Sequence, residues 1–467
     1  MTIIAADHST RFDAHVPLVI IGGGGCGLVA ALAAQDAGAE ALVLERDPVP
    51  RGSTAMSSGF IPAAGTRFQR LAGVGDDPET MAADIQAKND HEADPAIVQV
   101  LSQQAGGVIE WLADQHGLQF SLITGFLYPG HSRMRMHATP QRTGEELMGG
   151  LVLAAEKLGI PVVTNARVTE LYAGSDGLIR GVGLTRPDGR HETIGCDALL
   201  LACSGFGASP ELIAQHLPEM QDACYFGHDG NEGDALRWGD ALGASLRDLG
   251  GYQGHGSLAV PHQILIAWVV TLQGGVQINS EGYRFSNEHG GYSEQARTVL
   301  QQPGKMVWNV YDQRIHDLLL AEFRDYRDAL AAGAVRRFAT LGEMADDLSL
   351  PLDALESVFA AMARHAVDGT RDEFGRSFSD ETLLKAPFYA VRVTGALFHT
   401  QGGLEIDVTG RVLRPNGSAF PNLFAAGGAA RGISGAGGKG YSAGNGLLSA
   451  VVMGAIAGRS AARLVAD

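Results

Sequence analysis

Residues 18–27 have the sequence Leu-Val-Ile-Ile-Gly-Gly-Gly-Gly-Cys-Gly, and an Ala- and Leu-rich run extends from Leu28 to Ala34. The four apolar residues predict a buried strand, and the Ala/Leu run predicts a helix packed on a sheet. Between them, Gly22 permits a tight turn, Gly24 lets the backbone approach a pyrophosphate, and Gly27 lets the helix pack closely on the strand. The N-terminus of the helix would then offer N–H groups to phosphates.

A second apolar run, from Ala41 to Leu44, ends in Glu45. An acidic residue about 20 residues beyond the glycines can accept both hydroxyls of an adenosine ribose. Strand, glycine turn, helix and acid all occur in the order of a dinucleotide-binding unit. We therefore predict a dinucleotide site at this end of the chain.

Three further segments favour FAD over NAD. Arg51 to Gly59 is a loop of small and hydroxylated residues, which suits close approach of the backbone to a flavin. Near the other end of the chain, Asn422 to Gly428 predicts a strand running into glycines, and Gly444-Asn445-Gly446 opens an apolar helix. Flavoproteins complete their nucleotide domain with such C-terminal segments, where a helix N-terminus can stabilise the reduced flavin anion.

Length and charge restrict the function class. A chain of 467 residues predicts two domains, and 45% hydrophobic with 19% charged residues is typical of a globular protein. The net charge of −17 disfavours binding to nucleic acid or to anionic membranes. The most apolar internal run, around Ile264 to Leu272, is far shorter than the ~20 residues of a membrane span.

No signal-peptide pattern is visible in residues 1–16, so the sequence favours a cytoplasmic protein. The cysteines form no CxxC, haem or iron–sulfur motif and predict no metal site, but buried small residues in a reducing compartment: Cys26, Cys196, Cys203 and Cys224.

Several motifs resemble, in order, those of the flavoprotein family of fumarate reductases, succinate dehydrogenases and 3-ketosteroid dehydrogenases. Residues 199–206 resemble the family strand that ends in A-T-G-G-F, with Cys203 and Ser204 as departures. The other matching segments are Gly230 to Ala235 (G-N-E-G-D-A), Gly274 to Asn279, Arg284 to Glu288 (R-F-S-N-E) and His399 to Gly403 (H-T-Q-G-G).

The resemblance implies an α/β fold with a Rossmann-like FAD-binding domain in two segments, residues 1–251 and 386–467. Residues 252–385 would form an inserted α+β cap over the flavin. It also implies a small-molecule substrate and an external electron acceptor. The residues expected to bind FAD are Gly22, Gly24, Gly25, Gly27, Glu45, Arg46, Gly52, Ser53, Thr54, Ser57, Ser58, Gly59, Val168, Ala202, Ser204, Gly205, Asp234, Gly427, Gly428, Asn445, Leu447 and Leu448.

Two tyrosines stand where the dicarboxylate enzymes of the family carry arginines. Counting forward from the R-F-S-N-E motif places Tyr292 at the proton-delivering arginine, and the C-terminal glycine motif places Tyr441 at the carboxylate-gripping arginine. This pattern resembles the ketosteroid Δ1-dehydrogenases, where one tyrosine acts as base and the other binds the ketone oxygen. A slip of one or two residues would instead bring in Tyr283 or Ser442.

By this resemblance Tyr292 removes an α-proton, Tyr441 and a backbone N–H near Gly444 stabilise the enolate, and flavin N5 accepts hydride. His399 and His137 match histidines that contact substrate in the family. Arg133, or alternatively Arg135, can receive a substrate carboxylate. The resemblance thus implies four residues in contact with the substrate: His399, His137, Arg133 and Gly444.

The favoured function is therefore FAD-dependent α,β-desaturation of a cyclic ketone, either a small one such as 4-oxocyclohexanecarboxylate or a 3-ketosteroid. The alternative is an enoate reductase like the fumarate and urocanate reductases. A non-enzymatic flavin-binding protein is a third class, disfavoured by the tyrosines and histidines in the matched motifs.

FAD is expected to be held non-covalently, because Ser53 occupies the place of the histidine that bonds the flavin in succinate dehydrogenases. Acid precipitation of the holoprotein should leave the yellow chromophore in the supernatant. Colour that stays with the washed pellet would contradict the prediction.

Overall fold

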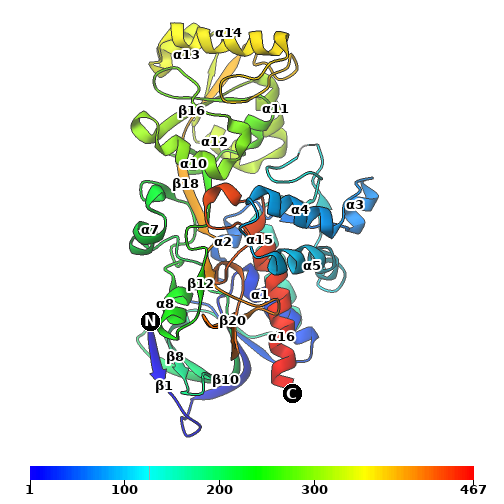
Figure 1. The fold of residues 1–467 in the computed structure, drawn as a ribbon, viewed down its shortest axis with the longest axis vertical. Coiled ribbons are helices and arrows are strands. Elements are labelled where there is room, and N and C mark those ends of the chain that lie inside the picture. The colour runs from blue at the N-terminus through cyan, green and yellow to red at the C-terminus, as the bar shows by residue number, and fades with distance from the viewer. Residues whose placement is uncertain (126, 467) are drawn as a thin grey trace. The chain divides into compact units, whose positions relative to one another are not determined.

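The computed structural model describes residues 1–125 and 127–466. These residues form two compact units. Unit 1 consists of Met1–Pro218, Gly227–Gln253 and His399–Asp467, and unit 2 of Glu219–Phe226 and Gly254–Phe398. Figure 1 shows the elements of both.

The core of unit 1 is a sheet in which β2 (Ala14–Ile21) lies between β10 (His191–Leu201) and β3 (Ala41–Leu44), parallel to both. On the far side of β3 the sheet continues in parallel with β7 (Val162–Val163). Strand β3 is buried at every residue, as expected for a parallel strand covered on both faces. The predicted strand before the glycines is thus a central strand of the sheet.

Strand β10 links two kinds of pairing. Its first half pairs antiparallel with β9 (Ile179–Thr185), which pairs with β8 (Arg167–Ala173) in a meander. Its second half, from Leu199 to Leu201, pairs parallel with β21 (Ala419–Ala425). The C-terminal segment therefore completes the sheet begun by the N-terminal one, as predicted for a nucleotide domain built from two chain segments.

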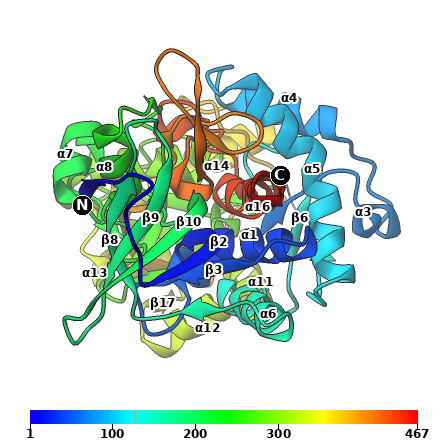
Figure 2. The same ribbon diagram turned by 90° about the horizontal axis from the view of Figure 1, so that it is seen from below.

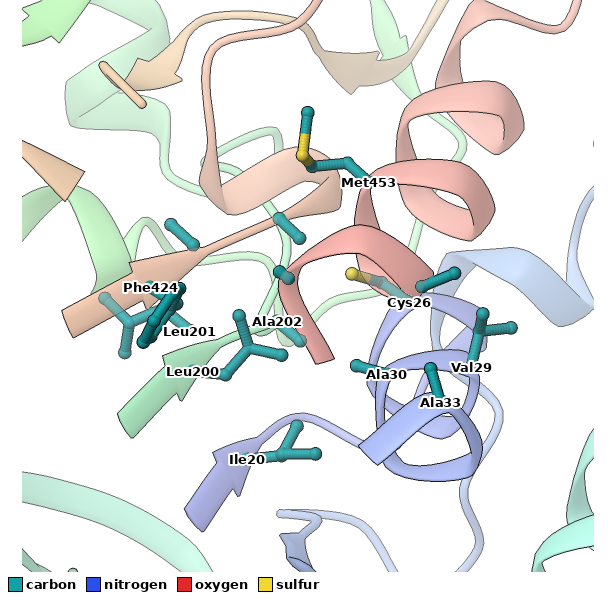
Figure 3. Close-up of a cluster of buried hydrophobic side chains, with 14 of the residues drawn as sticks. Ile20, Cys26, Val29, Ala30, Ala33, Leu200, Leu201, Ala202, Phe424 and Met453 are labelled. Atoms are coloured by element: carbon teal, nitrogen blue, oxygen red, sulfur yellow. The ribbon is translucent and has the colours of Figure 1, made fainter. Parts of the chain in front are cut away.

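The helices α1 (Gly25–Asp36) and α16 (Gly454–Ala466) pack against each other and against this sheet (Figure 2). A Cβ at Gly458 would lie 2.2 Å from the carbonyl oxygen of Ala30, so only glycine permits this approach. Figure 3 shows Ile20, Leu200 and Phe424 from three strands gathered beside Cys26 and Ala30 of α1. The burial of these side chains accounts for the apolar sequence on both sides of the glycine turn.

The remaining elements of unit 1 surround this core. The other strands are β1 (Thr2–Ala5), β4 (Ile61–Pro62), β5 (Ser121–Leu122), β6 (Met136–Ala138), β12 (Leu246–Arg247), β19 (Gly403–Leu404) and β20 (Arg411–Leu413). The other helices are α2 (Gly52–Ala55), α3 (Arg67–Leu71), α4 (Pro78–Lys88), α5 (Pro95–Asp114), α6 (Gly144–Lys157), α7 (Pro210–His216), α8 (Asp234–Ala241) and α15 (Asn445–Leu448), and a π-helical turn at Ser449–Met453 joins α15 to α16.

Unit 2 is built around a sheet with the order β14-β13-β18-β16-β15, to which β11 and β17 add at β18. Its strands are β11 (Cys224–Tyr225), β13 (Tyr252–Ala259), β14 (Ile264–Leu265), β15 (Val276–Ile278), β16 (Met306–Asp312), β17 (Val335–Phe338) and β18 (Phe388–Thr400). Its helices are α9 (Val269–Leu272), α10 (Tyr292–Leu300), α11 (Gln313–Glu322), α12 (Arg324–Ala331), α13 (Leu341–Leu348) and α14 (Leu352–Asp368). The predicted α/β class with an α+β insertion is confirmed.

The unit boundaries differ from the predicted ones. Unit 1 resumes at His399 rather than at residue 386, because β18 first carries the chain through the sheet of unit 2, where it pairs with β16 along its length. The segment Glu219–Phe226, which sequence reasoning left in the nucleotide domain, belongs to unit 2 because β11 pairs with β18. The predicted entry into the insertion at residue 252 lies close to the observed Gly254.

Among the described residues, one helical stretch, Asn445–Ala466, is long and apolar enough to cross a membrane by length and composition, and 61% of its most apolar window is buried inside the protein. The packing of α16 on α1 accounts for that apolar composition.

Two adjacent glycines in α5 offer a matched test of this packing. A Cβ at Gly106 would lie 2.5 Å from the carbonyl oxygen of Ala64, whereas a Cβ at Gly107 meets nothing within 4 Å. We expect Gly107→Ala to stabilise the protein by roughly 0.5–1 kcal/mol through the helix backbone. Gly106→Ala should lose stability, because overpacking costs about 1–3 kcal/mol. Urea unfolding measures both, and an equal shift of the two midpoints would contradict this account.

Candidate active site

The glycine turn after β2 has the geometry of a nucleotide-binding turn. A Cβ at Gly27 would lie 1.8 Å from the carbonyl oxygen of Gly22, so helix and strand meet in backbone contact there. A Cβ at Gly24, in contrast, would meet no protein atom within 4 Å, which leaves the open approach that a pyrophosphate needs. The helix α1 begins at Gly25, and its first N–H groups are therefore at this opening.

Glu45 lies at the end of β3, as predicted. Its Oε2 accepts the N–H of Gly23 at 2.8 Å and its Oε1 accepts the N–H of Asp47 at 2.9 Å. These two bonds fix the carboxylate beside the glycine turn. Each oxygen retains a further lone pair for a ribose hydroxyl.

A cleft opens along this turn and is lined by residues from both the N-terminal and the C-terminal segments of unit 1. Thirteen of the residues expected to bind FAD line it, namely Gly22, Gly24, Gly25, Glu45, Arg46, Gly52, Ser53, Thr54, Val168, Ala202, Ser204, Asp234 and Gly428. The other nine lie outside the lining: Gly27, Ser57, Ser58, Gly59, Gly205, Gly427, Asn445, Leu447 and Leu448.

Sequence reasoning missed three polar or charged residues of this cleft, Arg167, His228 and Asn231. The hydroxyl oxygen of Ser53 accepts the backbone N–H of His228 at 3.2 Å and the side-chain amide of Asn231 at 2.8 Å. His228 also pairs with Asp47 at 2.6 Å. The G-N-E-G-D-A motif that contains Asn231 was the available signal, since Asp234 of the same motif also lines the cleft.

Tyr441 is buried in unit 1 at the approach to α15. Its hydroxyl oxygen accepts the N–H of Gly446 at 3.3 Å, and its ring meets that of His399 edge-on at 5.6 Å. Burial raises the pKa of Tyr441, and the backbone amides of Gly446 and Gly444 only partly offset this. The phenol is therefore protonated at neutral pH, which suits a hydrogen-bond donor and not a base.

His399 packs on the same turn. A Cβ at Gly446 would lie 2.5 Å from its Nε2, and its Nδ1 is 3.2 Å from the side-chain amide of Gln401. Burial lowers the pKa of His399 to about 4, so the ring is neutral at pH 7. The structure thus brings together three predicted residues, Tyr441, His399 and Gly444.

Tyr292 is the first residue of α10 in unit 2 and is 8% exposed. Its ring stacks on His255 at 4.9 Å, and His255 also stacks on Phe398 at 5.3 Å. The preceding loop is fixed by Glu288, whose pKa is held at about 2 by Arg376 and Arg284 against the effect of burial. The position of Tyr292 is thus set by a buried ion-pair network in its own unit.

His255 and Trp268 are residues of this cluster that sequence reasoning did not single out. Both are buried, and within residues 1–125 and 127–466 neither Nδ1 of His255 nor Nε1 of Trp268 has a hydrogen-bond partner. Burial lowers the pKa of His255 to about 3, which keeps its ring neutral. No clear signal was available, because β13 has the mixed sequence Tyr-Gln-Gly-His-Gly-Ser-Leu-Ala and belongs to none of the recognised motifs.

The structure does not support substrate contacts by His137 or Arg135. In His137, Nδ1–H donates to the carbonyl oxygen of Arg135 at 2.9 Å and Nε2 accepts the hydroxyl of Thr66 at 2.8 Å, so both ring nitrogens are engaged. Arg135 is buried against Asp76 and Asp84.

Arg133 is exposed and donates to the carbonyl oxygen of Ser132, and nothing places it at a buried site. Among the described residues, no group of three or more His, Cys, Asp or Glu side chains is arranged to hold a metal ion.

A family model described as an FAD binding domain (FAD_binding_2) matches residues 18–447. The chain belongs to this family. It is accordingly an FAD-dependent oxidoreductase that acts on carbon–carbon bonds.

Three similar proteins indicate the range of chemistry in the family. The chain is 28% identical to a probable fumarate reductase of Shewanella frigidimarina, over 96% of this chain and 75% of that protein. It is 26% identical to a urocanate reductase of Eggerthella lenta, over 88% of this chain and 69% of that protein. The crystal structure of the 3-ketosteroid-Δ4-(5α)-dehydrogenase of Rhodococcus jostii superposes with a TM-score of 0.79 at 26% identity, covering 99% of this chain and 100% of that one.

The residues of unit 1 fit FAD. The open approach at Gly24 suits its pyrophosphate, and Glu45 suits its adenosine ribose. At the start of the C-terminal helix, Oδ1 of Asn445 and Oγ of Ser449 are buried without a partner among the described residues. Buried polar atoms are normally hydrogen-bonded, and the polar pyrimidine edge of a flavin would satisfy them.

Gly24 gives a direct test of the pyrophosphate site. Its φ of −73° is allowed to any residue, so Gly24→Ala should fold normally, yet the new methyl group would occupy the cofactor's space. We expect the affinity of the apoprotein for FAD, measured by quenching of flavin fluorescence, to fall at least about tenfold, or about 1.4 kcal/mol. Unchanged affinity with an unchanged melting temperature would contradict the assignment.

Proposed function

We propose that this flavoenzyme desaturates a cyclic ketone, either a small one such as 4-oxocyclohexanecarboxylate or a 3-ketosteroid. The observation that carries the proposal is Tyr441, a buried, protonated phenol in the motif where dicarboxylate enzymes carry an arginine. Desaturation next to a carbonyl needs a donor for the developing enolate oxygen, and a phenol serves this purpose without a charge.

In the proposed reaction Tyr441 donates its hydroxyl proton in a hydrogen bond to the ketone oxygen. The hydroxyl oxygen itself accepts the N–H of Gly446, which orients the group. As negative charge develops on the ketone oxygen this hydrogen bond becomes stronger, so it stabilises the transition state more than the ground state. One donor of this kind is typically worth about 2.7–4 kcal/mol of barrier.

Tyr292 accepts the α-proton in this proposal. It is the first residue of α10 in unit 2, and its ring is held in place by stacking on His255. FAD supplies the acceptor for the hydride that leaves the adjacent carbon with its electron pair. Loss of the proton and the hydride converts the saturated ketone to an α,β-unsaturated one, and an external acceptor later removes the two electrons.

The buried arginines support a substrate other than a dicarboxylate. Arg135 pairs with Asp76 and Asp84, and Arg376 pairs with Glu288. Arg284 and Arg431 are likewise engaged by carboxylates. An arginine already bidentate to a protein carboxylate has few donors to offer to a substrate carboxylate.

His399 favours a substrate that carries a polar group near the ketone end. It is neutral, lies beside Tyr441, and is held by the side-chain amide of Gln401. We propose that it contacts the substrate beside Tyr441, whose hydroxyl is in turn held by the N–H groups of Gly446 and Gly444. Because His137 and Arg135 are engaged within the protein, neither has a part in this proposal.

Enoate reduction is the second candidate, favoured by the relatives that are named fumarate and urocanate reductases. It would run the same chemistry in reverse, with reduced FAD as the hydride donor and a protein acid at the α-carbon. In desaturation the saturated ketone reduces the flavin, whereas in enoate reduction the unsaturated acid reoxidises the reduced flavin.

Anaerobic mixing of the oxidised holoenzyme with candidate substrates distinguishes the two functions. We expect 4-oxocyclohexanecarboxylate or a 3-ketosteroid to bleach the flavin absorbance, and succinate to leave it unchanged. If no saturated ketone bleaches the flavin, while fumarate or urocanate reoxidises the reduced enzyme, the proposal is wrong and the reductase is favoured.

Two conservative variants test the catalytic roles. Tyr441→Phe should lower the rate of flavin reduction by about 10²–10³, the effect of losing one oxyanion donor, and Tyr292→Phe should lower it at least as much. Tyr283→Phe is the matched control, because Tyr283 is 50% exposed and is the residue that a motif slip would bring in. Full turnover by both Phe variants with FAD bound would contradict the assigned roles.

A further inference from the structure

A buried ion-pair network lies in unit 1 behind the loop that carries Tyr441. The guanidinium of Arg135 donates from Nε and Nη2 to the two carboxylate oxygens of Asp76, both at 2.9 Å, and from Nη1 to Asp84 at 2.7 Å. The side chains of Arg135 and Asp76 are fully buried. Burying charged groups costs free energy that their pairing offsets only in part, so stability alone does not explain this network.

The network reaches one further residue, His131. Nη1 of Arg135 lies 3.4 Å from Nδ1 of His131, and Nε2 of His131 lies 2.8 Å from the carbonyl oxygen of Ala443. A carbonyl only accepts, so Nε2 carries the proton, and Nδ1 then faces Arg135 as an acceptor. Burial lowers the pKa of His131 to about 4, which keeps the ring in this neutral form.

The carbonyl that His131 holds belongs to the peptide between Ala443 and Gly444. A peptide is planar, so fixing its oxygen also fixes the direction of the N–H of Gly444 on the opposite side. The N–H of Ala443 is held as well, by the carbonyl oxygen of Pro129 at 3.1 Å. The loop at residues 129–131 therefore clamps the backbone of Ala443 at both of its polar groups.

Beyond this clamp the chain turns back on Tyr441. Gly444 has a φ of +83°, which favours glycine, and the next helix begins at Asn445. The amides of Gly444 and Gly446 consequently face the hydroxyl of Tyr441, where both counteract the rise of its pKa on burial. The direction of the Tyr441 hydroxyl thus depends on how this turn is held.

We propose that His131 is a positioning residue: by holding the carbonyl of Ala443, it aims the Gly444 amide at the Tyr441 hydroxyl and so directs that hydroxyl at the oxygen of the substrate. Arg135, itself fixed by Asp76 and Asp84, sets the tautomer of His131. This inference rests on the proposed function, because it concerns the donors that would stabilise the enolate. His131 touches neither the substrate nor the cofactor in this role.

Three variants of His131 separate this role from simple packing. His131→Leu removes both ring contacts. His131→Gln places a side-chain amide near the position of Nε2 and can still donate to Ala443, whereas the shorter side chain in His131→Asn does not reach. His137→Gln is the matched control, because His137 is also buried and fully hydrogen-bonded but contacts Thr66 and Arg135 instead of the Ala443 turn.

The readouts are kcat, KM and the Kd for 4-nitrophenol, all per FAD-containing holoenzyme. The phenolate of 4-nitrophenol carries a negative oxygen on a planar six-membered ring and so mimics the enolate. Roughly tenfold losses of kcat and of 4-nitrophenol affinity are expected for His131→Leu and His131→Asn, the scale of one hydrogen bond, with KM little changed. His131→Gln should recover most of both, and His137→Gln should alter only the melting temperature.

Unchanged kcat and phenolate affinity in His131→Leu would overturn the proposal, as would equal losses in the Gln and Asn variants. If the Leu variant does not fold, the Gln and Asn pair decides the same question. Tyr441→Phe in the same assays distinguishes a failure of the positioning role of His131 from a failure of the proposed function. Loss in Tyr441→Phe without loss in His131→Leu refutes only the positioning role, whereas no loss in Tyr441→Phe refutes the proposed function.

Discussion

The backbone contact between helix α1 and the turn after β2 governs the arrangement of unit 1. At Gly27 the helix lies so close to the carbonyl of Gly22 that no side chain fits. This contact places the first turn of α1 at the cleft and lets α16 pack on its other side, where Gly458 meets Ala30 in the same manner. Because α16 is joined through the π-helical turn and α15 to the loop that carries Tyr441, the cofactor cleft and the proposed oxyanion donor are supported by the same pair of packed helices.

The proposed chemistry uses neutral donors in place of charged ones. A dicarboxylate substrate calls for cations at its binding site, but here the buried arginines Arg135 and Arg376 hold protein carboxylates. Tyr441 is kept protonated and His399 is kept uncharged by burial. Neutral hydrogen-bond donors in a buried site can stabilise a negative charge that develops during the reaction. They are less suited to a substrate that already carries a full negative charge. Such a site suits a ketone.

Features that are local in the chain were predictable from the sequence. The glycine turn, Glu45 and the motif that contains Asp234 each lie within a short segment, and the structure places all three at one cleft. Features that depend on contacts between residues far apart in the chain were not predictable from the sequence. Arg135 was considered for a substrate carboxylate because Asp76 and Asp84, more than fifty positions away, give no local sign that they hold it. The end of the insertion was misplaced because β18 serves the sheet of unit 2 before the chain returns to unit 1.

In the proposed reaction, α-proton removal assisted by a phenol donor accompanies the loss of hydride from a ketone. The most direct measurement is a single-turnover isotope effect: anaerobic rapid mixing of the oxidised holoenzyme with a cyclic ketone, unlabelled or deuterated at the α-carbon or at the adjacent carbon. We predict that the flavin bleaches more slowly when either carbon carries deuterium. Equal rates for all three ketones, or bleaching that no ketone produces, would contradict it.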